Sequence, residues 1–401
     1  MRIAVNGLFW GRSTTGSGQY TMELLKVLLA HYPEHRYLLL LHPASGLKPS
    51  AGEAGRTAQS PAETLTPEVT PGGLTTCSLP TPLDRLGANW AKLWFEQVTF
   101  PRFCRRQRAD VAHVPYWASP LWSGLPTVVT IHDLIPLVLP AYRGSALVRL
   151  YSRLVAASAR RAAYVVTDSE ASRRDIIRLL PIPPDRVQTV YLAADESFRP
   201  VTDRTVLDVV RRKYGLPERY VLYLGGFDQR KNVAFLLQAY ARLTREWSGA
   251  PYLVIAGRLP KNDTPFFPDP QRRAAELGLT GRTAFIGWVD EADKPALYSG
   301  AELFVFPSAY EGFGLPVLES LRCGTPAVVT DAGSLPEIAG DGGVQVPVGD
   351  LDGLCQAMGR VLREPAWRET LRQAGLDHSR HFTWERTAAK MAAVYGQLTR
   401  K

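Results

Sequence analysis

Length, composition and cysteine content exclude several classes of protein. The chain has 401 residues, of which 45% are hydrophobic and 21% are charged. It is too apolar for a disordered protein, and at about 150 residues per domain its length indicates two or three domains. No apolar run reaches the roughly 18–20 residues of a membrane span, and the opening MRIAVNG predicts a buried strand rather than a signal peptide. The scattered cysteines predict neither a zinc site nor a disulfide framework, which favours a reducing cytoplasm: Cys77, Cys104, Cys323 and Cys355.

The net charge of +9 is unevenly distributed along the chain. The first 200 residues carry 22 Lys and Arg against 15 Asp and Glu, whereas the remainder carries 25 against 23. An electropositive first half favours an anionic partner, which could be nucleic acid, anionic lipid or a phosphorylated substrate. Charge alone does not choose among these three.

Ten short apolar runs along the chain are predicted strands. In the first half they cover 2–7, 37–42, 110–115, 127–133 and 164–169, and in the second half 220–226, 252–257, 283–289, 303–308 and 326–331. Near-continuous runs of Val, Ile and Leu are typical of strands whose sheet is covered by helices on both faces. Because helical stretches separate the runs, the sequence predicts an α/β protein with two doubly wound parallel-sheet domains.

Changes in composition predict the domain boundaries. Polar residues and a proline interrupt the pattern near 195–205, so we expect one domain over 1–198 and a second over 199–383. Residues 44–76 are rich in Ala, Ser, Thr, Gly and Pro and predict a flexible surface insertion. The final segment 384–401 predicts a helix that could pack on either domain.

The segment PSAYEGFGLPVLESLRCGTP, which begins at Pro307, carries the clearest pattern of a binding site. Gly312 and Gly314 precede a helix, and such a loop and helix N-terminus suit an anion such as pyrophosphate. Glu311 in the loop and Glu319 in the first helical turns can accept hydrogen bonds from sugar or ribose hydroxyls. Glu319 can equally be an ordinary acid favoured near a helix N-terminus.

Three further segments follow predicted strands. Arg230 and Lys231 are adjacent cations before a helix; they could neutralise a diphosphate or form a solvated turn. Gly16 and Gly18 open a helix after the first strand, but GSGQYT lacks the glycine spacing of nicotinamide-dinucleotide sites. His132 lies at the end of a predicted strand. A lone histidine is more often structural, but a histidine at a strand end is a better candidate for contact with a substrate.

Together these segments resemble the retaining glycosyltransferases of family GT4, which have the GT-B architecture of two Rossmann-like domains facing an interdomain cleft. EGFGLPVLE matches the family's E-x7-E signature with Glu311 and Glu319 at the family's spacing. The segments GSG, IHDLIP, GGFDQRKN and FVFPSAYEGFGLPVLESLRCGTPAV follow the family's order over nearly the whole chain. Their form is most similar to the mannosyltransferase-type branch that builds bacterial surface polysaccharides.

The resemblance implies a role for each predicted site residue. Glu319 would bind the ribose hydroxyls of the nucleotide, and Glu311 and His132 would contact the donor sugar. Arg230 and Lys231 would bind its phosphates, so that the catalytic residues would be His132, Glu311, Arg230 and Lys231. Backbone groups would hold the sugar and the diphosphate at Gly312, Phe313, Gly314 and Leu315, and the N-terminal loop would close at Gly16 and Gly18.

The implied reaction is metal-independent hexosyl transfer with retained anomeric configuration and no cofactor beyond the nucleotide-sugar co-substrate. GDP-mannose is the first choice of donor and UDP-sugars are next; the acceptor would be a glycan or a lipid-linked glycan. Gly226 departs from the family, since many members have Arg there, and phosphate binding would then depend on Arg230 and Lys231 alone. Asp350 and Asp352 form a DxD pattern like that of metal-dependent enzymes, but Asp at a helix start is an ordinary cap.

The basic and aromatic stretch 89–108 has two interpretations. Trp90, Leu93 and Trp94 share helical spacing with Gln97 and Val98, and an arginine-rich run follows: Arg102, Arg105, Arg106 and Arg108. It predicts either a helix packed on the first sheet with a solvated end, or contact with anionic lipid on the inner face of the membrane.

Two other functions stay open. The first is a different GT-B reaction, such as epimerisation or hydrolysis of a sugar nucleotide. The second is a nucleic-acid-binding protein, suggested by the positive charge. The E-x7-E loop and the two adjacent cations argue against the second, and we expect no nucleic-acid partner.

Overall fold

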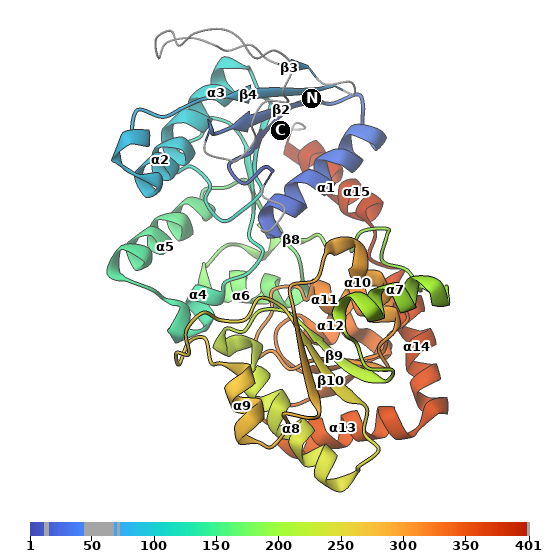
Figure 1. The fold of residues 1–401 in the computed structure, drawn as a ribbon. Coiled ribbons are helices and arrows are strands. Elements are labelled where there is room, and N and C mark those ends of the chain that lie inside the picture. Colours follow the sequence, from blue (N-terminus) through green and yellow to red (C-terminus); the bar gives the residue numbers. More distant parts are fainter. Residues whose placement is uncertain (12–15, 44–67, 70–72, 399–401) are drawn as a thin grey trace, which may run out of the picture. The chain divides into compact units, whose positions relative to one another are not determined.

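The computed structural model describes residues 1–11, 16–43, 68–69 and 73–398. It divides the chain into two compact units, which Figure 1 shows in ribbon form. Unit 1 comprises Met1–Asp168, Ser172–Tyr191 and Trp384–Lys401, and unit 2 comprises Ser169–Ala171 and Leu192–Thr383. The chain thus passes into unit 2 a few residues before the predicted boundary, and the C-terminal helix returns to unit 1.

The sheet of unit 1 has the strand order β3-β4-β2-β1-β5-β6-β7-β8. All pairings are parallel except that of β3 with β4. β5 and β6 are buried along their full length, as expected of central strands covered on both faces. The strands are β1 (Arg2–Asn6), β2 (Arg36–Leu41), β3 (Glu68–Val69), β4 (Leu74–Ser78), β5 (Val111–Val114), β6 (Thr127–Thr130), β7 (Tyr164–Thr167) and β8 (Val187–Thr189).

Helices cover this sheet, and α1 packs against the C-terminal helix α15 (Figure 1). The helices are α1 (Gly16–His31), α2 (Ala88–Trp94), α3 (Phe100–Arg106), α4 (Ile135–Val138), α5 (Ala146–Ala159), α6 (Glu170–Leu179) and α15 (Trp384–Leu398). A π-helical turn, η3 (Phe95–Thr99), joins α2 to α3, and short 3-10 turns cover Asp84–Leu86 (η2), Pro140–Tyr142 (η4) and Pro184–Arg186 (η5).

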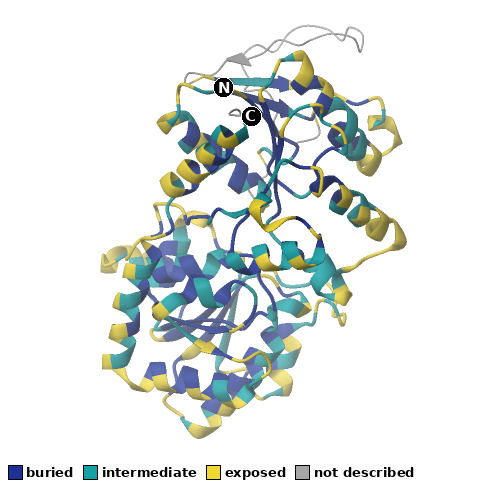
Figure 2. Cartoon of the chain, turned by 180° about the vertical axis from the view of Figure 1, so that it is seen from behind, coloured by how far each residue is buried: buried dark blue, intermediate teal, exposed yellow. Residues whose placement is uncertain are grey.

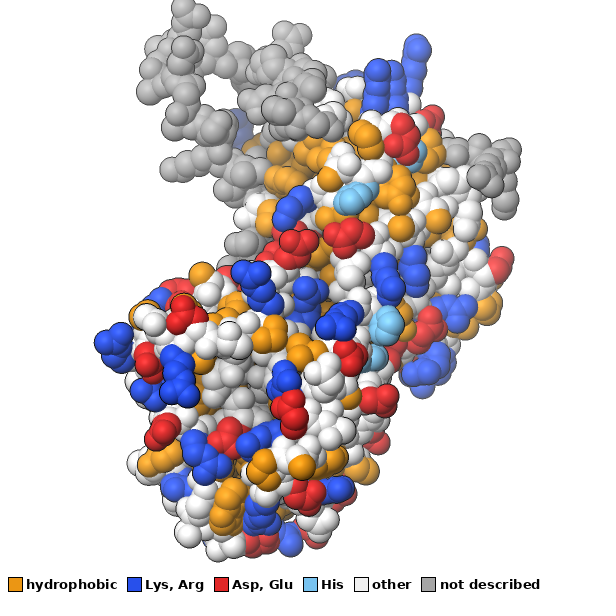
Figure 3. All heavy atoms as spheres, turned by 90° about the vertical axis from the view of Figure 1, so that its right-hand side faces the viewer, with side chains coloured by type: hydrophobic (Ala, Val, Ile, Leu, Met, Phe, Trp, Pro, Cys, Tyr) orange, Lys and Arg blue, Asp and Glu red, His pale blue; other side chains and the backbone are white. Residues whose placement is uncertain are grey.

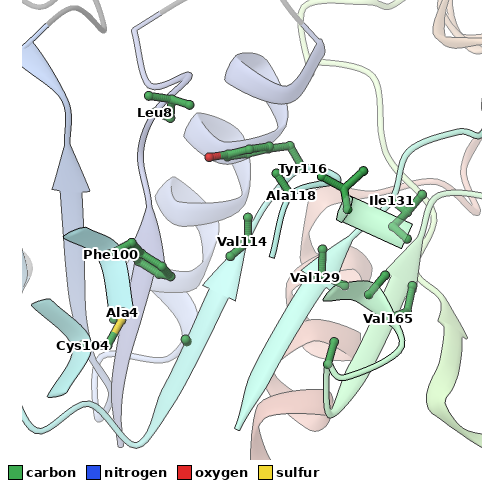
Figure 4. Close-up of a cluster of buried hydrophobic side chains, with 14 of the residues drawn as sticks. Ala4, Leu8, Phe100, Cys104, Val114, Tyr116, Ala118, Val129, Ile131 and Val165 are labelled. Carbon is green, nitrogen blue, oxygen red and sulfur yellow. The ribbon is translucent and has the colours of Figure 1, made fainter. Parts of the chain in front are cut away.

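The core of unit 1 shows that the stretch 89–108 packs on the sheet. Figure 4 shows Phe100 and Cys104 of α3 among the strand residues Ala4, Val114 and Val129. The predicted apolar stripe is wrong in phase, since Trp90 is 59% exposed and Leu93 and Trp94 are only partly buried. Helix α2 instead turns its Ala91 side to the core, and η3 then adds one residue to the helical repeat, so that Phe95 and the next buried apolar residue, Phe100, are five residues apart. The buried positions are instead Ala91, Phe95, Phe100, Phe103 and Cys104.

The sheet of unit 2 is parallel throughout and has the order β11-β10-β9-β12-β13-β14. Figure 2 shows buried residues concentrated on the strands and exposed residues on the outer helix faces. The strands are β9 (Tyr220–Leu224), β10 (Tyr252–Ala256), β11 (Thr283–Gly287), β12 (Leu303–Phe306), β13 (Ala327–Thr330) and β14 (Gly343–Val346). The helices are α7 (Arg204–Tyr214), α8 (Val233–Glu246), α9 (Pro270–Glu276), α10 (Lys294–Ser299), α11 (Leu315–Arg322), α12 (Leu335–Ala339), α13 (Leu351–Arg363) and α14 (Pro365–Ser379), with 3-10 turns at Gln229–Lys231 (η6), Glu291–Asp293 (η7) and Gly340–Gly342 (η8).

The part of the chain that the structure describes contains all ten predicted strands and four that were not predicted. β8 and β14 are short strands at sheet edges whose polar residues interrupt any apolar run. The insertion predicted for 44–76 lies mostly outside the described residues. At its C-terminal end the prediction is wrong, because residues there form a strand. Leu74 begins β4, which pairs in parallel with β2, because Leu74 and Cys77 bury their side chains despite the surrounding threonines.

Within the described residues, no helix combines the length and the apolar character that crossing a membrane would require. On the face that Figure 3 shows, Lys and Arg side chains are interspersed with Asp and Glu side chains.

Candidate functional site

The loop between β12 and α11 in unit 2 is held by close backbone packing. Gly314 has a φ of +101°, in the left-handed region, and directly precedes α11. Gly333 approaches the loop so closely that a Cβ there would lie 2.4 Å from the carbonyl oxygen of Glu311. The Ser334 hydroxyl donates to the Phe313 carbonyl over 2.6 Å, and the Ser169 hydroxyl donates to the Gly312 carbonyl over 2.7 Å. The loop therefore presents a fixed helix N-terminus, where the first N–H groups have no helical partner.

Glu311 lies in this loop and forms ion pairs with both predicted cations. Its Oε1 atom is 2.6 Å from a guanidinium nitrogen of Arg230 and 2.8 Å from Nζ of Lys231. Arg230 also donates to the Tyr310 carbonyl over 2.8 Å, and the Arg230 carbonyl accepts from the Ala309 amide over 2.7 Å. Residues from two distant segments thus meet at the ends of β9 and β12.

The charges in this cluster keep Glu311 ionised. Burial by itself would raise the pKa of Glu311, but Lys231 and Arg230 outweigh burial and hold the pKa below its ordinary value. Nζ of Lys231 also lies 4.8 Å from the centre of the Phe306 ring, a cation–π contact that helps to hold the side chain in place. The two cations are therefore held in place before any ligand arrives, as preorganised stabilisation of an anion requires.

Glu319 faces a different set of groups from α11. Its Oε2 atom accepts a hydrogen bond from the Tyr298 hydroxyl over 2.8 Å. Desolvation raises the pKa of Glu319, while the nearby charge of Lys294 acts in the opposite direction. The structure thus separates the two glutamates of the sequence motif, since one pairs with cations and the other accepts from a tyrosine.

Gly226 lies just beyond β9 and has room for a side chain. A Cβ at this position would lie 3.4 Å from the Asp228 carboxylate, an ordinary contact, and the φ of Gly226 is not positive. The backbone therefore does not require glycine there.

In unit 1, His132 follows β6 and donates from both ring nitrogens. Nδ1 is 2.7 Å from an oxygen of Asp168, and Nε2 is 3.2 Å from the Pro115 carbonyl oxygen. Because both partners are acceptors, this geometry fits the imidazolium. Burial alone would lower the pKa of His132, but the charge and hydrogen bond of Asp168 raise it above the ordinary value.

Asp168 is a site residue that the sequence analysis missed. It follows β7 and is 2% exposed, and its second oxygen is buried without a hydrogen-bond partner among the described residues. The available signal was its position, since it ends a predicted strand just as His132 does.

A buried network beneath His132 fixes the end of β6. The His113 ring bonds to the Thr130 hydroxyl over 2.9 Å and to the Tyr395 hydroxyl over 2.8 Å. The Tyr20 ring meets the His132 ring edge-on, with 5.0 Å between ring centres. Burial lowers the pKa of His113 to about 3, so this histidine stays neutral. Helix α15 is thereby tied to the strand that carries His132.

The two predicted N-terminal glycines lie at the start of α1. Gly16 is its first residue and is exposed, whereas Gly18 is buried in its first turn. The residues before them, 12–15, lie outside the described part of the chain.

The DxD pattern of the sequence has a structural explanation. The Asp350 carboxylate caps α13 by accepting from the Gly353 amide over 2.9 Å, and Asp352 forms an ion pair with Arg242. Among the described residues, no group of three or more His, Cys, Asp or Glu could hold a metal ion.

Comparisons with known proteins cover nearly the whole chain. Residues 15–198 match the family model described as Glycosyltransferase Family 4, and residues 208–378 match Glycosyl transferases group 1. O-antigen chain mannosyltransferase B of Escherichia coli is 34% identical over 271 residues, which are 68% of this chain and 70% of that protein. Serotype-specific mannosyltransferase WbdA of the same species is 32% identical over 266 residues, but this chain spans only 32% of its length.

Solved structures support the fold over the whole chain. Sucrose-phosphate synthase from Thermosynechococcus elongatus matches with a TM-score of 0.73 and 23% identity, covering 99% of each chain. Anabaena Alr3699/HepE in complex with UDP and glucose matches with a TM-score of 0.70 and 17% identity, covering 99% of this chain and 100% of that one. The predicted fold class, an α/β chain of the GT-B type with two Rossmann-like sheets, is confirmed.

Proposed function

The chain belongs to glycosyltransferase family 4, and from this premise we propose that it is a hexosyltransferase that moves mannose from GDP-mannose to a glycan. We expect the acceptor to be a sugar or a lipid-linked sugar of a surface polysaccharide. The relatives that are 32–34% identical over about two thirds of this chain are named as O-antigen and serotype-specific mannosyltransferases, which supports the choice of mannose. UDP-sugars are the next candidates, because a neighbour of similar fold binds UDP and glucose.

The cluster of Glu311, Arg230 and Lys231 is the observation that carries this proposal. Two cations beside a helix N-terminus suit the diphosphate that departs from a nucleotide sugar. Because Glu311 holds both cations in position, little reorganisation is needed as charge develops on the leaving group. The protein cations would do the work of a metal ion, so the proposed reaction is metal-independent.

We propose retention of the anomeric configuration without a covalent enzyme intermediate. The Glu311 carboxylate is occupied by two ion pairs, and Glu319 accepts from Tyr298, so neither is arranged as a nucleophile. The acceptor oxygen would form its bond to the anomeric carbon on the face from which the diphosphate leaves. The bond between that carbon and the phosphate oxygen would break, and a phosphate oxygen would take the acceptor proton.

The other predicted residues have matching tasks in this proposal. Glu319 would accept from the ribose hydroxyls, and the backbone of the β12–α11 loop would hold the diphosphate. His132, kept cationic by Asp168, would exchange the bond from its Nε2 to the Pro115 carbonyl for one to the donor sugar. We expect the protein to work in the cytoplasm, at the inner face of the membrane where lipid-linked acceptors are exposed.

The test is transfer from GDP-mannose to a mannose-terminated oligosaccharide, with and without a metal chelator. We expect an α-linked product whose anomeric configuration, followed by NMR, matches that of the donor. The Lys231→Met variant should lose activity, whereas Lys390→Met on α15 should keep it. Release of free mannose, or of an epimer, without any acceptor would instead support the epimerase or hydrolase alternative.

A further inference from the structure

Helix α5 of unit 1 exposes an apolar stripe. Leu147 is 77% exposed, Leu150 is 63% exposed and Leu154 is partly buried. These leucines are three and four residues apart, so they lie along one side of the helix. Val155 and Ala159, on another side, belong to the core of unit 1. The helix is therefore anchored by one face while its leucine stripe faces outward.

Three arginines that form no ion pair among the described residues accompany this stripe, although Arg149 donates to the Gly144 carbonyl over 3.0 Å. Arg149 and Arg153 on α5 and Arg143 just before it are exposed. No described carboxylate forms a salt bridge with any of the three, and the sequence has no acidic residue between Asp133 and Asp168. Leucines beside uncompensated arginines are the pattern of a helix that lies on an anionic lipid surface.

Helix α2 contacts α5 and carries an exposed tryptophan. Nζ of Lys92 lies 4.8 Å from the centre of the Tyr151 ring, and the Tyr151 hydroxyl donates to Glu96 over 2.9 Å. Helix α2 and the turn η3 thus contact α5 at Tyr151, and Figure 1 shows α2 near α5 in unit 1. Trp90 on α2 is 59% exposed, and tryptophan is favoured where a bilayer meets water.

The exposed valines of α7 in unit 2 provide a contrast. Val206 and Val209 are 43% and 50% exposed, so they resemble the α5 leucines in apolar exposure. Two of the four cations of α7 are paired, however, since Arg211 pairs with Asp208 at 3.1 Å and Lys213 pairs with Asp290 at 2.7 Å. Partial pairing with carboxylates, rather than less exposed apolar area, therefore distinguishes α7 from the α5 surface.

We propose that α5, together with Trp90 of α2, docks unit 1 on an anionic lipid bilayer, with its arginines at the phosphate headgroups and its leucines at the acyl boundary. This surface differs from the arginine run 102–108, whose apolar neighbours Phe103 and Cys104 are buried in the core. The inference deepens the proposed function, because docking would bring the enzyme to lipid-linked acceptors. Docking needs neither donor nor acceptor, so the two proposals are tested separately. Vesicle binding can be absent while glycosyl transfer is observed, and transfer can be absent while vesicle binding is observed.

The test is co-sedimentation of the full chain with vesicles, without any nucleotide sugar. We expect binding to vesicles of phosphatidylglycerol and phosphatidylethanolamine, weak binding to pure phosphatidylcholine, and release by high salt. The double variant L147S/L150S should partition about tenfold more weakly, because two apolar side chains no longer enter the bilayer. R149Q/R153Q should lose most of the preference for the anionic vesicles.

The matched control is V206S/V209S on α7, which should sediment like the unchanged protein. All three variants alter exposed side chains, so their thermal melting should be unchanged. Equal vesicle binding by the unchanged protein and L147S/L150S would overturn the proposal. It would also be overturned if L147S/L150S changed only the oligomeric state in gel filtration, since the stripe would then be a contact between copies.

Discussion

Replacing Asp168 by Asn tests whether a buried ion pair keeps His132 cationic. The ring nitrogen and the carboxylate oxygen are 2.7 Å apart, and the Asp168 side chain is 3% exposed. Opposite unit charges about 4 Å apart attract by about 4 kcal/mol at an effective dielectric constant of about 20. Desolvation of the His132 ring offsets part of this attraction. We therefore expect Asp168→Asn to lower the free energy of unfolding by about 3 kcal/mol, which is at the low end of the range for breaking a buried ion pair.

The sign of the pH dependence follows from the raised pKa of His132. A histidine whose pKa is higher in the folded than in the unfolded protein adds to the free energy of unfolding. This contribution is complete below the ordinary pKa of about 6.5, and it is lost as the pH rises through the pKa of the folded state. The difference between the unchanged protein and Asp168→Asn should therefore be largest near about pH 6 and smaller near about pH 9. Neighbouring titratable groups do not change this direction, because His113 stays neutral and burial raises the pKa of Tyr20.

Urea denaturation at the two pH values measures the free energies, and NMR of the His132 ring follows its titration directly. Asp133→Asn is the matched control: Asp133 lies next to His132 in sequence, but its carboxylate accepts from the Ile135 amide rather than from the ring. We expect Asp133→Asn to lower the pKa of His132 as well, but by less than Asp168→Asn does. An Asp168→Asn protein whose His132 titrates as in the unchanged protein would refute the reasoning, as would a stability difference that does not vary with pH.

Three further variants test other parts of the structure. Lys231→Met should weaken binding of GDP by about tenfold or more in calorimetry, because a charged hydrogen bond is worth about 1.5–3 kcal/mol; unchanged affinity would contradict the phosphate role. Gly226→Arg should fold normally, since a Cβ fits at this position. The added cation should tighten GDP binding about fivefold, an effect of about 1 kcal/mol. A large loss of thermal stability would contradict the conclusion that a side chain fits there. Burial raises the pKa of Glu96 to about 7, so the free energy of unfolding should fall as the pH rises from about 4.5 through about 7. Glu96→Gln should remove this cost, which is about 3 kcal/mol at about pH 8.5. Equal urea midpoints for the variant and the unchanged protein at that pH would contradict this expectation.

Local patterns in the sequence were sufficient for much of the fold. The central strands, such as β9 and β12, are runs of buried apolar residues, and such runs are visible without any knowledge of their neighbours. The short edge strands β8 and β14 were missed because they are stabilised by pairing with a neighbouring strand rather than by their own hydrophobicity. The π-turn η3 likewise left no local pattern, and it adds one residue to the helical repeat between the buried Phe95 and Phe100.

The sequence by itself determined that Glu311 and Glu319 flank one helix start, because loop, proline and glutamates are neighbours in the chain. It also placed Arg230, Lys231 and His132 after strands, where the ends of parallel strands bring side chains to one edge of a sheet. Only the tertiary structure decided which charges meet: Glu311 with two cations from a segment about 80 residues earlier, and His132 with Asp168. The physical reason is that an ion pair depends on distance in space and on burial, and neither can be read from separation along the chain.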